Sequence, residues 1–466
     1  MFEERKTIYL CLAHMSDNKI EEKYVQEAFD TNWVVPMGPN VNAFEKDLEE
    51  FANRPLRSSN TSPNLGEELD RRVVCLSAGT AAVHLALIAC GVQAGDEVCV
   101  QSFTFCASSH PITYLGAKPI FIDSERETWN MDPELLEKAI IDRKTQTGRY
   151  PKAIIPVALY GMPYQIDRIM EIADKYGIPV IEDAAEGMGS RFNGQVLGTF
   201  GKFGVLSFNG NKMITTSGGG ALICRNAEDA NEIMWYATQA RDAYPYYEHT
   251  AIGYNYRMSN VCAGIGRGQM TVLDDHIAHH KHVQELYREL LKDVEGVTLH
   301  EQPADPSTCS GQVPRYDSNF WLCAATLDPS VKIVGQENAY KEVIKTAVGG
   351  AAGVIKAVDS AVTDCQPNDN VEALRVFMLA KKVECRPVWK PMHKQPVYTG
   401  VVSEERRVKS EELSEGIICQ TSDRSVAYIN GVSEEIFKVG FCLPAGPYVT
   451  DEDVRYIVEC IKEAIV

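Results

Sequence analysis

An acid and a lysine in two separate turns are the residues best placed for chemistry. Asp183 ends the apolar run Ile178-Pro179-Val180-Ile181-Glu182, and Lys212 follows 29 residues later in the turn Ser207-Phe208-Asn209-Gly210-Asn211. A buried carboxylate needs a cationic partner, because burial without one is costly. Taken alone, Asp183 could equally cap a helix, and a lysine in an Asn/Gly turn is usually a solvated charge.

A third segment, Ser77-Ala78-Gly79-Thr80-Ala81-Ala82, joins an expected strand to the start of an expected helix. Free backbone N–H groups, the positive end of the helix dipole and the Thr80 hydroxyl would together form a seat for a phosphate. Many strand-to-helix turns are small and polar simply to fit, so this signal is weak by itself. No Gly-x-Gly-x-x-Gly dinucleotide motif occurs at any such junction.

The order of the three segments is more informative than any one of them. Pyridoxal phosphate requires a phosphate seat, an anion for its pyridine nitrogen and a lysine that binds it covalently. Along this chain the phosphate seat comes first, then the acid at the end of a strand, then Ser-x-x-x-x-Lys. The sequence therefore predicts a pyridoxal phosphate site.

Alternating short apolar runs and helical patterns must position these residues. We expect strands at 72–76, 96–100, 119–122, 153–157, 179–182, 203–207 and 220–224, and helices at 81–90, 132–141 and 165–176. This alternation predicts an α/β fold with helices on both faces of a largely parallel sheet, whose ligands bind at the carboxyl ends of the strands.

The length and composition indicate an ordinary globular enzyme of two domains. Of the 466 residues 45% are hydrophobic and 24% charged, and the net charge of −18 disfavours general nucleic-acid binding. No apolar run reaches the roughly 20 residues of a membrane span, and the first residues carry acids rather than the apolar core of a signal peptide. We expect a cytoplasmic protein with no nucleic-acid or membrane partner.

We expect three parts along the chain: an N-terminal segment that contributes to the substrate site (1–40), a large cofactor-binding domain (41–280) and a smaller C-terminal α+β domain (281–466). A long amphipathic helix at about 274–293 leads into the third part. Polar stretches at 55–70, 302–316 and 402–427 are typical of surface insertions, and 340–363 is helix-forming.

Neither the cysteines nor the histidines predict a metal site. The 14 cysteines contain no Cys-x-x-Cys pair and are expected to be reduced, mostly buried thiols, with Cys309 and Cys365 the most exposed. His276 and His280 are four apart and could share a metal on one helix face. No Glu or Cys is placed to complete the ligand shell, so a solvated helix face is the preferred interpretation.

The motifs resemble those of the fold type I pyridoxal-phosphate sugar aminotransferases, the DegT-type group of the aspartate aminotransferase superfamily. The similar segments occur in the same order as in that group and cover most of residues 20–285, returning at 385–393 and 438–446. They include 76–86, 102–105, 180–189, 207–220 and 253–259.

The resemblance implies a role for individual residues. Lys212 would bind the cofactor covalently and, once freed, act as the base of the 1,3-proton shift, while Asp183 would pair with the pyridine nitrogen. Glu186 would lie near the cofactor's hydroxyl, and Ala185 on the ring face opposite Phe105. Asn255 would reach the phosphate of the neighbouring subunit, which implies a homodimer with shared active sites. The residues implied for the phosphate and the ring are Gly79, Thr80, Ser207 and Phe105.

Within the group, 13–15, 31–39, 238–241, 246–249 and 386–393 are similar to the UDP-N-acetylbacillosamine transaminase branch. That likeness implies transfer of an amino group from glutamate to C4 of a UDP-linked 4-keto-6-deoxy N-acetylhexosamine, for bacterial surface glycans or glycoproteins. Trp33 would offer an apolar face to the substrate. Arg386, Lys390 and His393 would offer positive charges to its diphosphate. A domain-interface cluster is the alternative for these substrate residues, which are His14, Trp33, Val34, Val35, Pro36, Arg386, Trp389, Lys390 and His393.

Three other functions remain open at this point. The chain could act on another nucleotide-linked keto sugar, carried by GDP or dTDP. It could be a sugar dehydratase of the same family, although that variant carries His in place of the lysine and Lys212 argues against it. It could also be a non-catalytic regulatory protein that binds the cofactor or a nucleotide.

Overall fold

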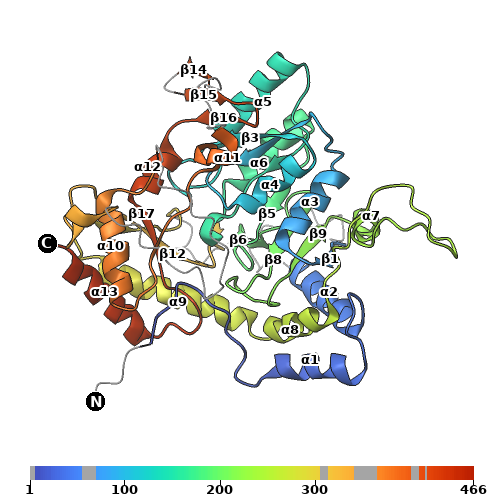
Figure 1. Ribbon diagram of the computed structural model, residues 1–466, viewed down its shortest axis with the longest axis horizontal. Helices are drawn as coiled ribbons and strands as arrows, with labels where there is room; N and C mark the ends of the chain where they lie inside the picture. Colours follow the sequence, from blue (N-terminus) through green and yellow to red (C-terminus); the bar gives the residue numbers. More distant parts are fainter. Residues whose placement is uncertain (1–5, 55–69, 305–312, 341–364, 400–408, 415–416) are drawn as a thin grey trace.

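The computed structural model describes residues 6–54, 70–304, 313–340, 365–399, 409–414 and 417–466, with backbone only for 409–414. The expected insertions at 55–70 and 302–316 and the stretch 340–363 therefore lie largely outside the described residues, as does Cys309. Figure 1 shows the described elements in two regions joined by the long helix α9 (Leu273–Leu291).

A mostly parallel sheet forms the centre of the larger region. Its strands are ordered β1 (Arg72–Leu76), β9 (Gly220–Cys224), β8 (Phe203–Ser207), β5 (Ile181–Asp183), β4 (Ile154–Ile155), β2 (Glu97–Gln101) and β3 (Lys118–Ile122). Single bridges from Ile154 to Val180 and from Val157 to Asp183 join the two halves of the sheet. Only β9 runs antiparallel to its neighbours among these seven strands. The expected α/β fold is confirmed.

Helices cover both faces of this sheet, close to the ranges expected from the sequence. Asp132 caps α5 by accepting the N–H groups of Glu134 and Leu135, with a proline in the first turn, and Gly177 ends α6 in the left-handed conformation that favours glycine. The helices of this region are α3 (Gly79–Ala89), α4 (His110–Tyr114), α5 (Pro133–Thr147), α6 (Ile166–Tyr176) and α7 (Ala227–Ala237).

A smaller antiparallel sheet forms the second region. Its order is β10 (Val297–Leu299), β12 (Cys323–Leu327), β17 (Gly440–Leu443) and β13 (Arg386–Pro387), and α10 (Asp369–Ala380), α12 (Val432–Val439) and α13 (Asp451–Ala464) pack with it. Ile8 pairs with Val383, which ties the start of the chain to this region. Short elements connect these parts: β6 (Arg191–Phe192), β7 (Gln195–Val196), β11 (Tyr316–Asp317), α11 (Pro396–Thr399), η1 (Cys106–Ser108), η2 (Leu159–Gly161), η4 (Gln336–Asn338) and η5 (Met392–Lys394).

Part of the expected insertion at 402–427 is instead an extension of the large sheet. β16 (Val426–Ile429) runs parallel to β3, with Val426 opposite Ile120, and β15 (Ile417–Thr421) and β14 (Lys409–Ser414) continue the sheet outward. Val426 and Ala427 are buried in apolar clusters with residues of the large sheet. A boundary near residue 280 therefore does not separate the two sheets completely.

Glycines let the first two helices approach α8 (Asn260–Met270) closely. α1 (Ile20–Asp30) and α2 (Pro39–Ala52) both pack on α8. A Cβ added at Gly266 would lie 2.6 Å from the Phe44 ring, and one at Gly268 would lie 2.6 Å from Glu21 Cγ. These positions leave no room for a larger side chain, so this contact depends on glycine.

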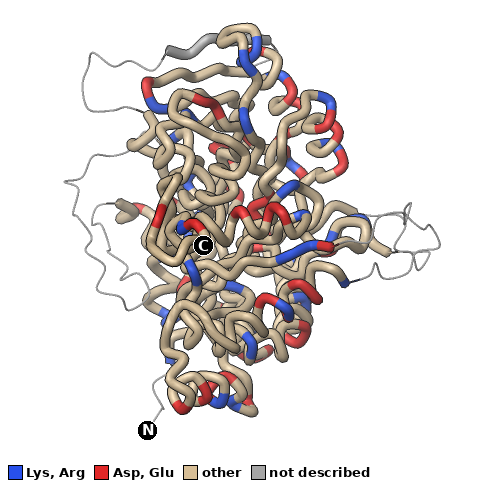
Figure 2. Tube along the Cα trace, turned by 90° about the vertical axis from the view of Figure 1, so that its right-hand side faces the viewer, with Lys and Arg blue, Asp and Glu red and all other residues tan. Residues whose placement is uncertain are grey.

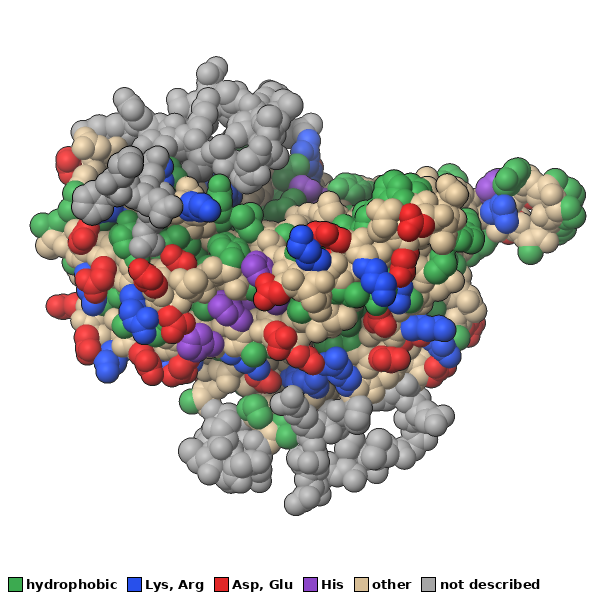
Figure 3. Space-filling model, turned by 90° about the horizontal axis from the view of Figure 1, so that it is seen from below, with side chains coloured by type: hydrophobic (Ala, Val, Ile, Leu, Met, Phe, Trp, Pro, Cys, Tyr) green, Lys and Arg blue, Asp and Glu red, His purple; other side chains and the backbone are tan. Residues whose placement is uncertain are grey.

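The chain between α7 and α8 leaves the body as an arm (Figures 1 and 3). Bridges between Thr238 and Asn255 and between Arg241 and His249 hold its two limbs antiparallel. The arm carries large exposed apolar side chains, and such a patch marks an interaction surface. These side chains are Tyr244, Tyr246, Tyr247 and Ile252, of which the last is 83% exposed.

Two sequence-based expectations for single side chains are wrong. Cys365 is buried, not exposed. His276 and His280 face the core rather than solvent, because α9 packs between the two regions. The Nδ1 atom of His276 bonds to the Met213 carbonyl, and that of His280 bonds to the Phe320 carbonyl. Within the described residues no group of three potential metal ligands occurs and no helix is long and apolar enough to cross a membrane.

Acidic and basic residues are interspersed along the described trace (Figure 2), so the net charge of −18 is not gathered in one element.

Candidate active site

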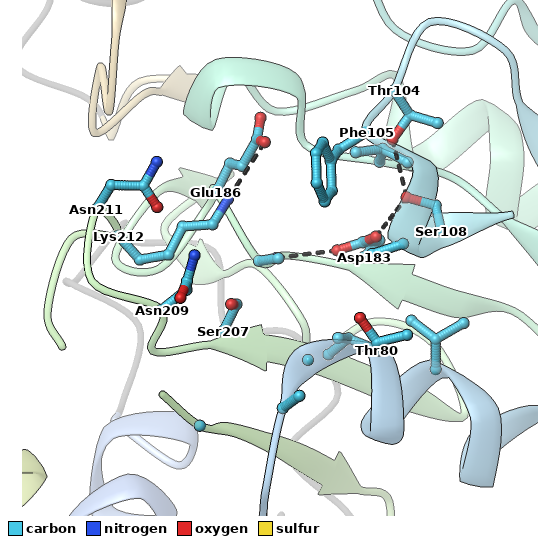
Figure 4. Close-up of a pocket in the computed structure, with 18 of the residues that line it drawn as sticks. Thr80, Thr104, Phe105, Ser108, Asp183, Glu186, Ser207, Asn209, Asn211 and Lys212 are labelled. Carbon is cyan, nitrogen blue, oxygen red and sulfur yellow. Dashed lines mark hydrogen bonds and ion pairs between the residues drawn. The ribbon is translucent and has the colours of Figure 1, made fainter. Parts of the chain in front are cut away.

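A cavity of about 300 Å³ lies at the carboxyl ends of the strands in the large region, where open parallel sheets bind ligands. Figure 4 shows side chains from β5, β8, α3, η1 and the turn after β8 converging on it. Among the residues predicted from the sequence, the cavity is lined by Gly79, Thr80, Phe105, Asp183, Ala185, Glu186, Ser207, Lys212 and Trp389.

The first turn of α3 forms one end of the cavity. Ala78 precedes this helix and no side chain caps its N–H groups. A Cβ at Gly220 would lie 2.4 Å from the Gly79 nitrogen, so the start of α3 packs directly on the backbone of β9. The hydroxyls of Thr80 and Ser207 line the same end, and neither bonds to another described residue. This end of the cavity has the donors that a phosphate needs.

Asp183 lies at the end of β5 with only 6% of its surface exposed. Its Oδ2 accepts a hydrogen bond from Ser108 Oγ at 2.6 Å, and its Oδ1 accepts the Ala185 N–H at 3.1 Å. Burial raises the pKa of Asp183, while the Ser108 hydrogen bond opposes that rise. No helix begins after Asp183, so the capping alternative is wrong. In the described chain no cation lies within ion-pair distance of this carboxylate.

Lys212 reaches the cavity from the turn after β8. Its Nζ lies 3.3 Å from Glu186 Oε1, and the two side chains are 13% and 5% exposed. The second Glu186 oxygen accepts the backbone N–H of Tyr160 at 2.8 Å. Burial raises the pKa of Glu186, and the nearby Lys212 charge opposes that rise. Glu186 is thus fixed at one oxygen and faces the lysine with the other.

Trp321 also contacts Lys212, and nothing in the sequence predicted it as a site residue. Its ring centroid lies 4.0 Å from Lys212 Nζ, and its indole N–H donates to the Asn211 carbonyl at 2.7 Å. Trp321 lies more than 100 residues further along the chain, just before β12 of the second region. Apolar residues beside a strand are ordinary core positions, so no local pattern marks this one as part of a site.

Two other hydroxyls of the cavity, on Thr104 and Ser108, were also missed. Both side chains are buried, and their oxygens lie 2.8 Å apart. They surround Phe105 in the sequence, and the short helix η1 turns Ser108 back toward Asp183. A serine in a turn has many ordinary uses, so its identity alone could not have singled it out.

Phe105 and Trp389 form an aromatic wall on the open side of the cavity. Their ring centroids are 5.5 Å apart at an angle of 54°, and Phe105 is 50% exposed. The hydroxyl of the buried Tyr160 accepts the backbone N–H of Trp389 at 2.8 Å. A flat ring could lie between Phe105 and the Ala185 side of the cavity, as the resemblance implies.

Pyridoxal phosphate, the cofactor implied by the resemblance, fits these residues. The N-terminus of α3 and the hydroxyls of Thr80 and Ser207 suit its phosphate. A protonated pyridine nitrogen would supply the positive charge that the buried carboxylate of Asp183 lacks among the described residues. Lys212 would hold its aldehyde carbon covalently. When bound, the cofactor supplies an electron sink for the carbon that exchanges its proton.

Asn255 does not line this chain's own cavity. It is exposed at the base of the arm, where its backbone pairs with Thr238.

Besides Trp389 and His393, the implied substrate residues fall into three sets. Trp33, Val34, Val35 and Pro36 form an exposed segment before α2, fixed by Asn260, which donates to the Trp33 carbonyl and accepts from the Asn40 N–H. Arg386 and Lys390 are partly buried, and Arg386 is ion-paired with Glu384. The partly buried His14 contributes its carbonyl to Gln269.

His393 differs from its expected role. Its side chain is 1% exposed, Nδ1 lies 2.6 Å from Ser102 Oγ, and Nε2 lies 3.1 Å from Glu434 Oε1. Both ring nitrogens are therefore engaged within the protein, and no donor is left for a diphosphate. The domain-interface alternative describes this side chain better.

Comparison with known proteins identifies the family of the chain. The sequence model of the DegT/DnrJ/EryC1/StrS aminotransferase family matches residues 15–330. EpsN of Bacillus subtilis (strain 168), named as a candidate pyridoxal phosphate-dependent aminotransferase, is 36% identical over 98% of this chain and 95% of its own. GDP-perosamine synthase of Escherichia coli O157:H7 is 29% identical over 95% of both chains.

The fold also matches solved structures. A DegT DnrJ EryC1 StrS aminotransferase from Brucella abortus superposes with a TM-score of 0.72 over 96% of this chain and 95% of its own, at 23% identity. Because the family model spans more than half of the sequence and a relative at 36% identity covers nearly all of it, the chain belongs to the DegT/DnrJ/EryC1/StrS aminotransferase family.

Proposed function

We propose that this chain, a pyridoxal phosphate-dependent aminotransferase of nucleotide-linked sugars, transfers the amino group of glutamate to C4 of a UDP-linked 4-keto-6-deoxy N-acetylhexosamine. The observation that supports the catalytic part best is that Lys212 and Asp183 share one cavity with the open N-terminus of α3. The substrate part rests on the similarity to the UDP-N-acetylbacillosamine transaminase branch.

In this proposal Lys212 Nζ takes the proton from the substrate carbon and delivers it to the second carbon of a 1,3-proton shift, on the far side of the nitrogen. A lysine can do so only in its uncharged form, and Glu186 Oε1 at 3.3 Å can hold the released proton between the two steps. The raised pKa of Glu186 suits this use, because burial makes the carboxyl group easier to protonate. Asp183 keeps a proton on the pyridine nitrogen.

The substrate would enter past Phe105 and Trp389. The exposed segment Trp33–Pro36 offers an apolar surface to a sugar or a base, and Lys390 offers a cation to a diphosphate. Arg386, which is ion-paired with Glu384, is the second cation of this proposal. His393 is not part of this proposal.

The proposed active unit is a homodimer with shared active sites. Asn255 is exposed and lies outside its own cavity, while the arm beside it carries tyrosines that a second subunit could cover. Asn255 would then donate a hydrogen bond to the phosphate in the partner's cavity.

A GDP-linked 4-keto sugar is the second candidate substrate. Relatives named GDP-perosamine synthase align with this chain over nearly the full length of both, at 27 to 29% identity. The two candidates differ in the nucleotide and in the N-acetyl group at C2 of the sugar.

A panel of UDP-, GDP- and dTDP-linked 4-keto sugars tests the proposal, with glutamate as donor and the amino sugar detected by mass spectrometry. We expect the UDP-linked N-acetyl substrate to give the highest kcat/KM. Preference for the GDP sugar would favour the second candidate, and the absence of turnover with all of them would contradict the catalytic proposal. Lys212→Ala should abolish turnover, while Lys202→Ala, a half-exposed lysine paired with Asp229, should not.

A further inference from the structure

Two buried hydroxyls connect the turn that carries Phe105 to the carboxylate of Asp183. Ser108 Oγ lies 2.6 Å from Asp183 Oδ2 and 2.8 Å from Thr104 Oγ1, and Figure 4 shows the three side chains in a row. Thr104 and Ser108 are each 1% exposed. The hydrogen bonds that join Thr104, Ser108 and Asp183 are therefore shielded from water, which does not compete for them.

The direction of these hydrogen bonds follows from the chemistry of the groups. An ionised carboxylate can only accept, so the single hydroxyl hydrogen of Ser108 is donated to Asp183. Thr104 must then be the donor to Ser108. The 2.6 Å separation lies in the range expected when a hydroxyl donates to an ionised oxygen, about 2.5–2.7 Å.

Asp183 has little other support for its charge. Apart from Ser108, the one donor to its carboxylate among the described residues is the Ala185 N–H, and burial raises the pKa of Asp183. Loss of the Ser108 hydroxyl would leave a buried carboxylate with one donor, which favours the protonated form. A protonated Asp183 can no longer attract a proton to a facing pyridine nitrogen.

We propose that Ser108, oriented by Thr104, is a positioning residue that keeps Asp183 ionised and directed toward the pyridine nitrogen of the cofactor. This inference rests on the proposed role of Asp183. Because Phe105 lies between Thr104 and Ser108, one turn supplies both the ring contact and the hydroxyl pair, so cofactor stacking and Asp183 ionisation depend on the same backbone.

The test replaces Ser108 by Ala and follows bound pyridoxal phosphate labelled with ¹⁵N in its ring. We expect the ring-nitrogen NMR signal to move toward the unprotonated value, kcat to fall roughly 10- to 100-fold, and the sugar KM to change little. Ser108→Thr keeps a hydroxyl and should restore both readouts. Thr104→Val removes only the outer donor and should give a smaller shift in the same direction.

Ser109→Ala is the matched control. Ser109 is also fully buried, but its Oγ bonds to the Cys106 carbonyl and to Tyr398, away from Asp183. It should leave the ring-nitrogen signal unchanged, so any general effect of cavity formation in this turn appears in both serine variants. If Ser108→Ala does not fold, the Thr104→Val variant carries the test.

A comparison with Asp183→Asn distinguishes a failure of the Ser108 inference from a failure of the proposed role of Asp183. If Asp183→Asn moves the nitrogen signal and Ser108→Ala leaves it within the range of the Ser109→Ala control, the inference is wrong and the role of Asp183 stands. If neither variant moves the signal, the role of Asp183 is wrong as well.

Discussion

The indole ring of Trp321 and the amine of Lys212 form a cation–π pair, with 4.0 Å between Nζ and the ring centroid. The same indole donates its N–H to the carbonyl of Asn211, the residue before the lysine. One side chain from the second region therefore contacts both the charged end of the lysine and the backbone that carries it.

Replacing Trp321 separates these two contacts. Trp321→Leu removes both the ring that holds the Lys212 side chain and the donor to the Asn211 carbonyl, so the less well positioned lysine should react with added pyridoxal phosphate roughly 10-fold more slowly. Trp321→Phe keeps a ring face but loses the N–H donor and should have a smaller effect. The rate at which visible absorbance develops in the cofactor-free protein measures this. Equal rates in the Leu variant and wild type would show that the ring does not position the lysine.

Asp183→Asn should retain the cofactor but lower kcat by at least about 100-fold, because an amide cannot hold a proton on the pyridine nitrogen. The Asn amide oxygen can accept the Ala185 N–H, and its NH2 group can donate to Ser108 Oγ, so the turn should remain folded. Cofactor content by absorbance and kcat by product formation are the two measurements. A rate within twofold of wild type would show that the charge of Asp183 is not used.

Mixing two inactive variants tests whether Asn255 acts across a dimer. Lys212→Ala removes the catalytic amine, and Asn255→Asp places a negative charge beside the phosphate, which weakens cofactor retention. In a mixed dimer one site combines an intact Lys212 with an intact Asn255 from the partner, while the other site carries both defects. We expect activity approaching one working site per mixed dimer.

The mixing result is interpretable only if subunits exchange, which native mass spectrometry of the mixture checks. Each homodimer alone should stay inactive. If mixed dimers form and no activity returns, the shared-site proposal is wrong and Asn255 is a local structural residue.

Glu434 should contribute stability that disappears in acid. Burial alone would raise its pKa, but hydrogen bonds from His393 and Lys394 outweigh burial and lower the pKa from 4.5 to about 2. A carboxyl group whose pKa is depressed by folding stabilises the folded state above its unfolded pKa, and that contribution is lost as the pH falls toward the folded pKa. The relevant range is therefore pH 4.5 down to about 2.

At pH 7, Glu434→Gln should lower the free energy of unfolding by at most about 3 kcal/mol, and the difference from wild type should shrink between pH 4.5 and 3. Urea unfolding at several pH values measures it. Glu435→Gln is the neighbouring control, since Glu435 is 60% exposed in its pair with Arg126 and should change stability by less than about 1 kcal/mol. A difference that stays constant with pH would contradict the ionic role of Glu434.

The sequence predicted the elements whose signals are local. The apolar run ending at Asp183 and the turn carrying Lys212 follow directly from strand and turn chemistry, and both side chains line the cavity. The contacts of Trp321 and Ser108 could not be predicted, because they depend on which distant segments meet. His393 shows the same limit in the opposite direction: this implied substrate residue is buried between Ser102 and Glu434, which no local pattern indicates.

The pairing of β16 with β3 has a consequence for how the protein folds. Val426 pairs with Ile120, which lies 306 positions earlier in the chain. During synthesis one edge of β3 therefore stays unpaired until the last tenth of the protein has left the ribosome. An exposed strand edge can pair with the strands of other chains. Contacts between residues this far apart in the sequence also form slowly. Truncation before residue 426 should therefore yield an aggregating chain rather than a soluble large domain.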